Sequence, residues 1–144
     1  MAKIHESIEI KASIDTIHAL LTTPKKIVLW YDGVDAVQPS SDYPAVNSSI
    51  EGAMKILAVE LKAKQTVLEN KPGLLSYQLE GMANGTQAWR TTDLGGGKVR
   101  LEVDTDFNLV GGVFGKLAEP MAIQMLGASA RKSLENIKKM AEGH

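Results

Sequence analysis

The sequence predicts a single α+β domain in which an antiparallel sheet wraps around a long C-terminal helix, with an apolar cavity between them. Three observations support this fold. Strands with alternating polarity fill the middle of the chain, two short helices follow the first strand, and the C-terminal part has the periodicity of one amphipathic helix. At 144 residues the chain has the usual length of one domain and can bury a core without disulfides.

Composition excludes several classes of function. Sixteen basic and seventeen acidic residues give a formal charge of −1, so neither nucleic acid nor an anionic membrane is expected as a partner. The absence of cysteine excludes a disulfide scaffold, a cysteine-ligated zinc site and a thiol nucleophile. The N-terminus lacks the apolar run of a signal peptide, and no stretch approaches the roughly 18 apolar residues of a membrane span. We therefore expect a cytoplasmic protein without membrane insertion.

The first element is a strand over residues 3–11. Isoleucines alternate there with polar residues, and a period of two is typical of a half-buried strand. Glu6 breaks the pattern because it falls on the apolar face, where an unpaired carboxylate is costly. It either serves the cavity as a polar or acid–base group or lies where the strand end reaches solvent.

Two short helices follow this strand. Ser13 is a suitable N-cap for a helix over residues 14–21, and Pro24 is well suited to start a second helix that runs to about Trp30. Residues 38–49 contain two prolines and several serines, and they are predicted to be mostly loop.

The chain between residues 50 and 109 reads as a meander of strands. Apolar residues alternate in each strand with residues that are mostly charged or threonine, so one face of the sheet meets a core and the other meets water. Turns are expected at residues 70–73, 84–85 and 95–97. The inward positions are Ile50, Gly52, Met54 and Ile56, then Leu61, Ala63, Gln65 and Val67, then Leu75, Tyr77, Leu79 and Gly81, and finally Val99, Leu101, Val103, Thr105 and Phe107.

The turn at residues 95–97 fixes the register of the last hairpin. A three-residue turn sets Leu94 opposite Lys98 and Arg90 opposite Glu102, whereas a two-residue turn shifts the pairing by one and breaks the charge pair. Because opposite charges across a strand pair are favourable, we prefer the first register.

The same register bears on Trp89. It sets Trp89 opposite Val103, and a matching register in the preceding hairpin sets Gly81 opposite Trp89 and Glu80 opposite Arg90. A glycine across from the indole leaves room for the ring, so Trp89 is predicted on the inner face. A slip of one residue would reverse this assignment.

The last element is a helix over residues 112–142, in which Pro120 predicts a kink or a restart. Residues 127–130 are small and leave room beside the sheet. A second apolar stripe on the N-terminal half must be covered by the loop around residues 30–43, by a ligand or by a partner subunit. The main stripe is Ile123, Leu126, Ala130, Leu134, Ile137 and Ala141, and the second is Phe114, Leu117, Met121 and Met125.

This order of elements resembles the START-like superfamily, also called SRPBCC, which includes polyketide cyclase/dehydrase-like proteins. The resemblance covers essentially the whole chain. It implies a helix-grip fold: a seven-stranded antiparallel sheet wrapped around the C-terminal helix, with two short helices between strands one and two and a cavity inside. The superfamily includes lipid and hormone carriers, cyclases and chaperone regulators, so it settles fold better than function. The segments that carry the resemblance are residues 7–12, 30–34, 95–101 and 133–138.

The first functional hypothesis is binding of a small hydrophobic or aromatic molecule in this cavity, without a cofactor. Binding would come from desolvation and from one or two orienting hydrogen bonds. The amide of Gln65 either orients the ligand or bonds to the backbone, and the rings of Tyr77 and Trp89 either line the pocket or pack in the core. The expected ligand-binding residues are Trp30, Met54, Gln65, Tyr77, Leu79, Trp89, Phe107, Met121, Met125 and Leu126.

Two alternatives remain open. One is a polyketide cyclase/dehydratase-like enzyme with Glu6 as its candidate catalytic group. No metal site is predicted, because His5, His18 and His144 share no obvious location. The other alternative is a homodimeric interaction module that uses the apolar stripe Phe114–Met125.

Overall fold

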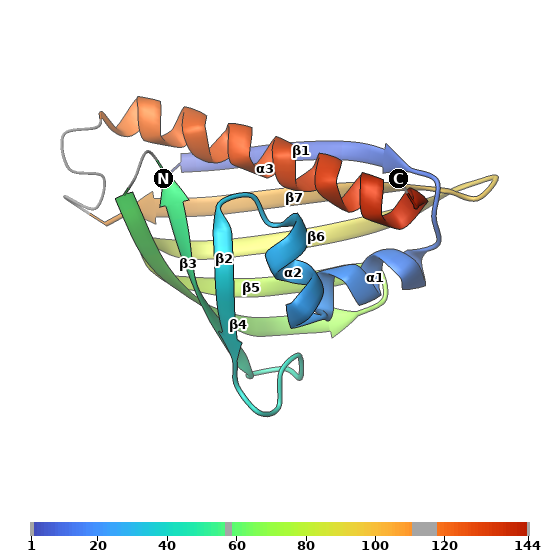
Figure 1. Ribbon diagram of the computed structural model, residues 1–144, viewed down its shortest axis with the longest axis horizontal. Coiled ribbons are helices and arrows are strands. Elements are labelled where there is room, and N and C mark those ends of the chain that lie inside the picture. Colours follow the sequence, from blue (N-terminus) through green and yellow to red (C-terminus); the bar gives the residue numbers. More distant parts are fainter. Residues whose placement is uncertain (1, 57–58, 111–117, 144) are drawn as a thin grey trace.

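The computed structural model describes residues 2–56, 59–110 and 118–143. It confirms the α+β helix-grip architecture, with ten elements in the predicted order (Figure 1). They are β1 (Ala2–Ile10), α1 (Ile14–Thr22), α2 (Pro24–Trp30), β2 (Val34–Pro39), β3 (Ser49–Ile56), β4 (Val59–Lys71), β5 (Leu74–Gly81), β6 (Ala83–Gly95), β7 (Lys98–Leu109) and α3 (Glu119–Glu142).

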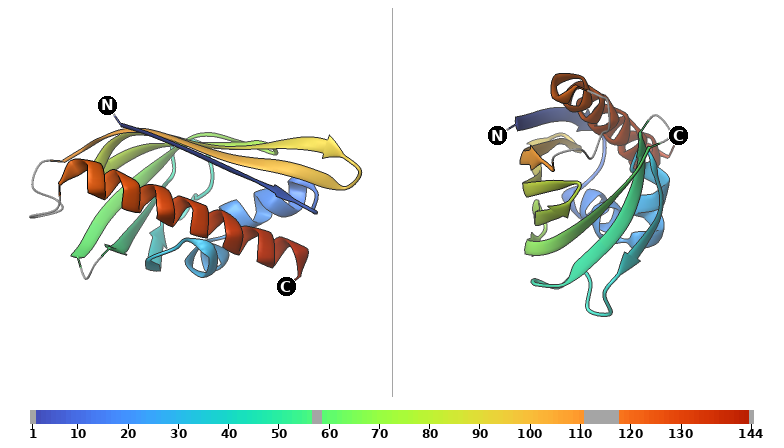
Figure 2. Two further views of the ribbon diagram at one scale, coloured as in Figure 1. Left: turned by 90° about the horizontal axis from the view of Figure 1, so that it is seen from above. Right: turned by 90° about the vertical axis from the view of Figure 1, so that its left-hand side faces the viewer.

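All seven strands form one antiparallel sheet in the order β1-β7-β6-β5-β4-β3-β2. β2 and β3 run steeply across the direction of β6 and β7, so the sheet is strongly curved (Figure 1). The three helices lie on its concave side, with α3 alongside β1 (Figure 2). A sheet with one covered face explains the alternating polarity of its strands.

The two short helices begin as predicted. The hydroxyl of Ser13 accepts a hydrogen bond from the backbone N–H of Thr16 at 3.1 Å, which caps α1. Pro24 is the first residue of α2, where the N–H that proline lacks would have had no partner inside the helix. Ile17 and Leu21 of α1 are buried.

β2 is a strand that the sequence pattern did not reveal. Residues 38–39 were assigned to a loop, but they pair with β3, where Pro39 lies opposite Ile50. β2 is an edge strand with a register irregularity between Val34 and Val37, and most of its residues are exposed. An edge strand without alternating burial leaves no period of two to detect.

The β6–β7 register is confirmed at Trp89, which lies opposite Val103, although the turn differs from the prediction. Gly95, and not Leu94, faces Lys98, so the turn itself has two residues. Leu94 is the extra residue of a bulge between Asp93 and Gly95. A two-residue turn plus one bulged residue has the same count as a three-residue turn, so the strands beyond it keep the predicted pairing.

The β5–β6 register was predicted wrongly. Trp89 lies opposite Leu75, not Gly81, and the reversal comes directly after Gly81 and not at residues 84–85. Gly81 has φ +106°, and a Cβ there would lie 2.5 Å from the carbonyl oxygen of Lys62, so only glycine fits this reversal. The error of six residues (81 − 75) is even, so it preserves the face. Trp89 is therefore buried as predicted, and Arg90 is exposed.

α3 starts at Glu119 with Pro120 in its first turn, and the predicted helical stretch before residue 118 lies outside the described residues, so the kink or restart at Pro120 stays a prediction. Phe114 and Leu117 lie outside the described residues. Leu134 and Ile137 of the main stripe are buried, and α3 ends at Gly143, whose φ of 80° is left-handed. Among the helices that the structure describes, none combines the length and apolar character needed to cross a membrane.

The interior has two apolar clusters. The larger one lies where α1, α2 and the C-terminal part of α3 meet the sheet, and there Trp30 makes an edge-to-face contact with Trp89 at 5.3 Å. The smaller one contains Met54 and Leu61, with Met82, Met125 and Leu126 packed against it. Residues from both clusters line the cavity described next.

Candidate ligand-binding site

A cavity of about 130 Å³ lies between the concave face of the sheet and α3. Among the residues predicted for ligand binding, it is lined by Met54, Gln65, Leu79, Phe107 and Leu126. Its wall is mostly apolar, and among the described lining residues the one charged residue is the exposed Glu51. The other lining residues are Ile4, Ile27, Tyr31, Val34, Val37, Ile50, Gly52, Ala53, Ala63, Met82, Ala83, Gln87, Thr105, Ser129 and Ala130.

The remaining predicted residues lie elsewhere. Trp30, Tyr77 and Trp89 are buried in the larger apolar cluster and do not line the cavity. Met125 packs against the smaller cluster, and Met121 is 53% exposed. Only Met121 and Met125 of the apolar stripe predicted for a dimer interface lie among the described residues, and the homodimer stays a prediction.

Small residues leave this space unfilled. Gly52 of β3 lies opposite Ala63 of β4, which lies opposite Gly81 of β5, so three neighbouring strands present almost no side chain along one row. On the helix side the cavity meets Ser129 and Ala130, within the predicted stretch of small residues. Close packing by larger side chains would fill such a gap.

Gln87 is the centre of a polar cluster in the cavity wall. Its Oε1 accepts hydrogen bonds from Nε1 of Trp89 at 3.1 Å and from Nε2 of Gln65 at 3.2 Å. Its Nε2 donates to Oγ1 of Thr105 at 3.2 Å. The amide of Gln87 is thereby held in place, although the side chain is almost fully buried.

Sequence reasoning missed Gln87 and Tyr31 as site residues. Gln87 precedes Trp89 by two positions and so shares its face, which was the available signal. Nothing in the local pattern pointed to Tyr31, because it follows α2 and reaches the cavity only through tertiary packing.

Hydrogen bonds to α3 hold the segment that carries Tyr31. The backbone N–H of Asp32 donates to Oγ of Ser133 at 2.9 Å, and Oγ of Ser129 donates to the carbonyl of Asp32 at 3.2 Å. Nδ2 of Asn136 donates to the carbonyl of Trp30 at 3.1 Å. Three polar side chains of the helix therefore fix one wall of the cavity.

The tyrosines of the interior stay neutral: Tyr31 lines the cavity, and Tyr43 and Tyr77 belong to the larger apolar cluster. Burial raises the pKa of Tyr31 above its usual value, although a hydrogen bond with Gln87 acts in the opposite direction. The hydroxyls of Tyr43 and Tyr77 are 2.6 Å apart. Burial raises the pKa of both, and that of Tyr77 lies well above the usual range.

Glu6 faces α3 and is not among the lining residues. Its Oε2 pairs with Nη1 of Arg131 at 2.9 Å, and its side chain is 23% exposed. The carboxylate is thus engaged by a cation outside the cavity, and this geometry lends no support to a catalytic role for it.

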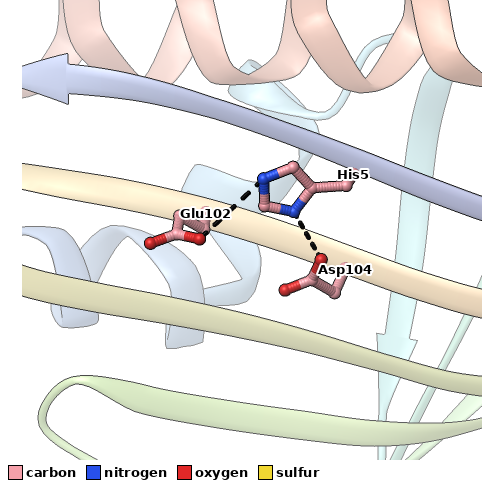
Figure 3. Close-up of side chains that lie close together, drawn as sticks. All are labelled: His5, Glu102 and Asp104. Atoms are coloured by element: carbon pink, nitrogen blue, oxygen red, sulfur yellow. Dashed lines mark hydrogen bonds and ion pairs between the residues drawn. The ribbon is translucent and has the colours of Figure 1, made fainter.

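A second cluster lies on the outer face of the sheet, where His5, Glu102 and Asp104 meet (Figure 3). Nδ1 of His5 lies 2.5 Å from Oδ1 of Asp104, and this hydrogen bond is the main cause of the raised pKa of His5. The three side chains are close enough to hold a metal ion. However, Arg90 donates to the other oxygen of Asp104 at 3.0 Å. The arrangement is therefore an ion-pair network.

Solved structures share this fold at low sequence identity. A Streptomyces aromatase/cyclase is 15% identical with a TM-score of 0.81, and the alignment covers 98% of this chain and 93% of that protein. A START superfamily protein from Mycobacterium smegmatis is 15% identical with a TM-score of 0.78, over 98% of this chain and 97% of the other. The Aha1 dimer from Colwellia psychrerythraea is 16% identical with a TM-score of 0.70, over 99% and 97%.

A search of curated protein sequences finds no significant match. A family profile described as polyketide cyclase/dehydrase and lipid transport matches residues 1–142. Together with the fold, this match confirms the superfamily that the sequence resembled. The chain belongs to the polyketide cyclase/dehydrase and lipid-transport family of START-like proteins.

Proposed function

We propose that this protein binds a small hydrophobic or aromatic molecule in the cavity between the sheet and α3. The observation that carries the proposal is a mostly apolar hollow whose wall holds one compact group of neutral hydrogen-bonding side chains. Such a combination is typical of ligand sites, because the apolar wall supplies affinity and a few polar groups orient the ligand. The family description, which names lipid transport, is consistent with this proposal.

The volume limits what fits. An apolar cavity of about 150 Å³ is large enough to bind benzene, so a cavity of about 130 Å³ encloses about one ring. The rest of a larger ligand would extend beyond this cavity. Met54 and Met82 line the cavity, and their flexible side chains allow it to widen around a bulkier molecule.

The two indole N–H groups provide a direct test. The N–H of Trp89 donates to the cavity residue Gln87, whereas that of Trp30 donates to the carbonyl of Leu20 at 2.8 Å. In a ¹H–¹⁵N titration with toluene we expect the Trp89 indole signal to shift more than the Trp30 signal. Native mass spectrometry of the purified protein would show whether a molecule co-purifies.

A cavity-filling variant sharpens this test. Ala63 faces glycines on both neighbouring strands, so Ala63→Leu places a larger side chain into the cavity. The matched control is Ala128→Leu, at an exposed position of α3. We expect Ala63→Leu to abolish toluene binding and the control to keep it. Binding that is equally strong in both variants would place the ligand outside this cavity and refute the proposal.

A further inference from the structure

We infer that the cavity selects an uncharged ligand whose polar end both donates and accepts hydrogen bonds, such as an amide or a hydroxyl, and that it rejects carboxylate ligands. This inference rests on the proposed binding function and names its ligand class. It follows from the orientation of two amide side chains and from the charges around the cavity.

The orientation of the Gln87 and Gln65 amides follows from the hydrogen bond that the buried Trp89 makes. The indole N–H of Trp89 can only donate, so the atom of Gln87 that it meets must be the amide oxygen. That oxygen also meets the amide of Gln65, which must therefore present its NH₂ group. The amide nitrogen of Gln87 then donates to Thr105, whose oxygen is the acceptor.

This chain of bonds leaves defined groups for a ligand. Oε1 of Gln65 can accept and its second N–H can donate, and Thr105 keeps its own hydroxyl proton for donation. Within the described residues, neither Oε1 of Gln65 nor the hydroxyl proton of Thr105 has a protein partner. In the described part of the chain, Oγ of Ser76 is the only side-chain N or O atom that is both buried and without a partner. Oε1 of Gln65 has no partner among these residues, so it must be accessible. Both residues line the cavity, so it offers an acceptor beside donors.

The charges around the cavity disfavour an anion. None of the described lining residues is a lysine, arginine or histidine, and the single charged one is Glu51, which is exposed. Arg131 on α3 is not a lining residue, and it is paired with Glu6 at 2.9 Å. A carboxylate in this cavity would lose its hydration without gaining a counter-ion.

Three single-ring probes of similar shape test this selectivity by isothermal titration calorimetry at pH 7. Toluene has no polar group, 4-methylbenzamide has a neutral donor and acceptor, and 4-methylbenzoate is an anion of nearly the same shape as the amide. We expect the amide to bind about 10-fold more tightly than toluene, because toluene leaves the polar groups of the wall without partners. We expect the benzoate to bind at least about 100-fold more weakly than the amide.

Substitution at Gln65 separates selectivity from affinity. In Gln65→Leu the preference for amide over toluene should fall to within about 2-fold, since the acceptor and its paired donor are gone. The control Gln78→Leu makes the same change at an exposed position of the neighbouring strand β5 and should keep the preference. Thr105→Val, which removes only the hydroxyl, is the second variant should Gln65→Leu fail to fold.

The outcomes distinguish the two proposals. Binding of all three probes with similar affinity, or an amide preference that survives in both Gln65→Leu and Thr105→Val, would overturn this inference and leave the binding function intact. If no probe binds, the binding function itself fails and the inference fails with it.

Discussion

Replacing Gln87 with leucine tests whether the buried polar cluster is built as the distances indicate. Leucine has a similar size and no amide, so the change removes the acceptor of the Trp89 indole at 3.1 Å and the links to Gln65 and Thr105. Gln65 and Thr105 line the cavity, where water can replace the lost partner. Trp89 is 3% exposed, so its N–H would have none.

The magnitude follows from that one orphaned donor. A buried N–H without an acceptor costs about 1–3 kcal/mol, which is the expected destabilisation by Gln87→Leu. Urea unfolding measures it, because a slope of about 1–3 kcal/mol per molar for a small domain turns this cost into a midpoint shift of about 1 M. The control Gln78→Leu changes an exposed glutamine, and it should stay within about 0.5 kcal/mol of the unsubstituted protein.

A double-mutant cycle isolates the hydrogen bond itself. Trp89→Phe removes the donor, so Gln87→Leu should cost about 1 kcal/mol less in that background than in the original protein. Additive effects of the two substitutions would show that the indole does not depend on Gln87. The orientation argument for Gln65 would then lose its starting point.

Three further substitutions test other features of the structure. Ser133→Ala should cost about 1 kcal/mol in thermal unfolding, because the backbone N–H of Asp32 loses its acceptor at 2.9 Å; no change in melting temperature would contradict this. Gly81→Ala should destabilise by about 1–3 kcal/mol in urea, since alanine at φ +106° would strike the backbone of β4, and full stability would mean that the reversal differs. Because hydrogen bonding to Asp104 raises the pKa of His5 above 6.5, that stabilisation is present below the unfolded-state value and is lost as pH rises through the folded-state value. At pH 5.5 the original protein should therefore have a higher free energy of unfolding than His5→Gln, and at pH 8.5 this difference should disappear. The pair is exposed, so the difference should stay below about 1 kcal/mol. A larger difference at pH 8.5 than at pH 5.5 would refute the assignment.

The sequence predicts the fold well because the fold depends on periodicity. A period of two identified most strands, and a capping serine and a proline marked the starts of the two short helices. β2 escaped because it is an edge strand with irregular pairing, and its place in the sheet comes from contact with β3 alone. Tertiary pairing of this kind leaves no trace in a local pattern.

The site is harder to predict, since a cavity occupies one position along the strands and periodicity fixes only the face. An even error of six residues in the β5–β6 register left Trp89 facing inward, but it moved Trp89 from opposite Gly81 to opposite Leu75. Tyr77 and Trp89 both lie on the predicted inner face, yet they pack in the core and not beside the cavity. Gln65 faces inward as well and does line it, so facing inward is necessary for a site residue but not sufficient.

Trp89 nevertheless bears on the site, because it connects the core to the cavity. A buried donor-only group sets the orientation of Gln87, and Gln87 in turn sets which end of Gln65 is left for a ligand. Without the indole N–H, the amide of Gln87 would be free to turn over, and donors and acceptors in the wall could exchange places. The core packing that shields Trp89 from solvent therefore also determines the hydrogen-bond pattern that a ligand meets. Stability and ligand selectivity thus depend on the same set of contacts.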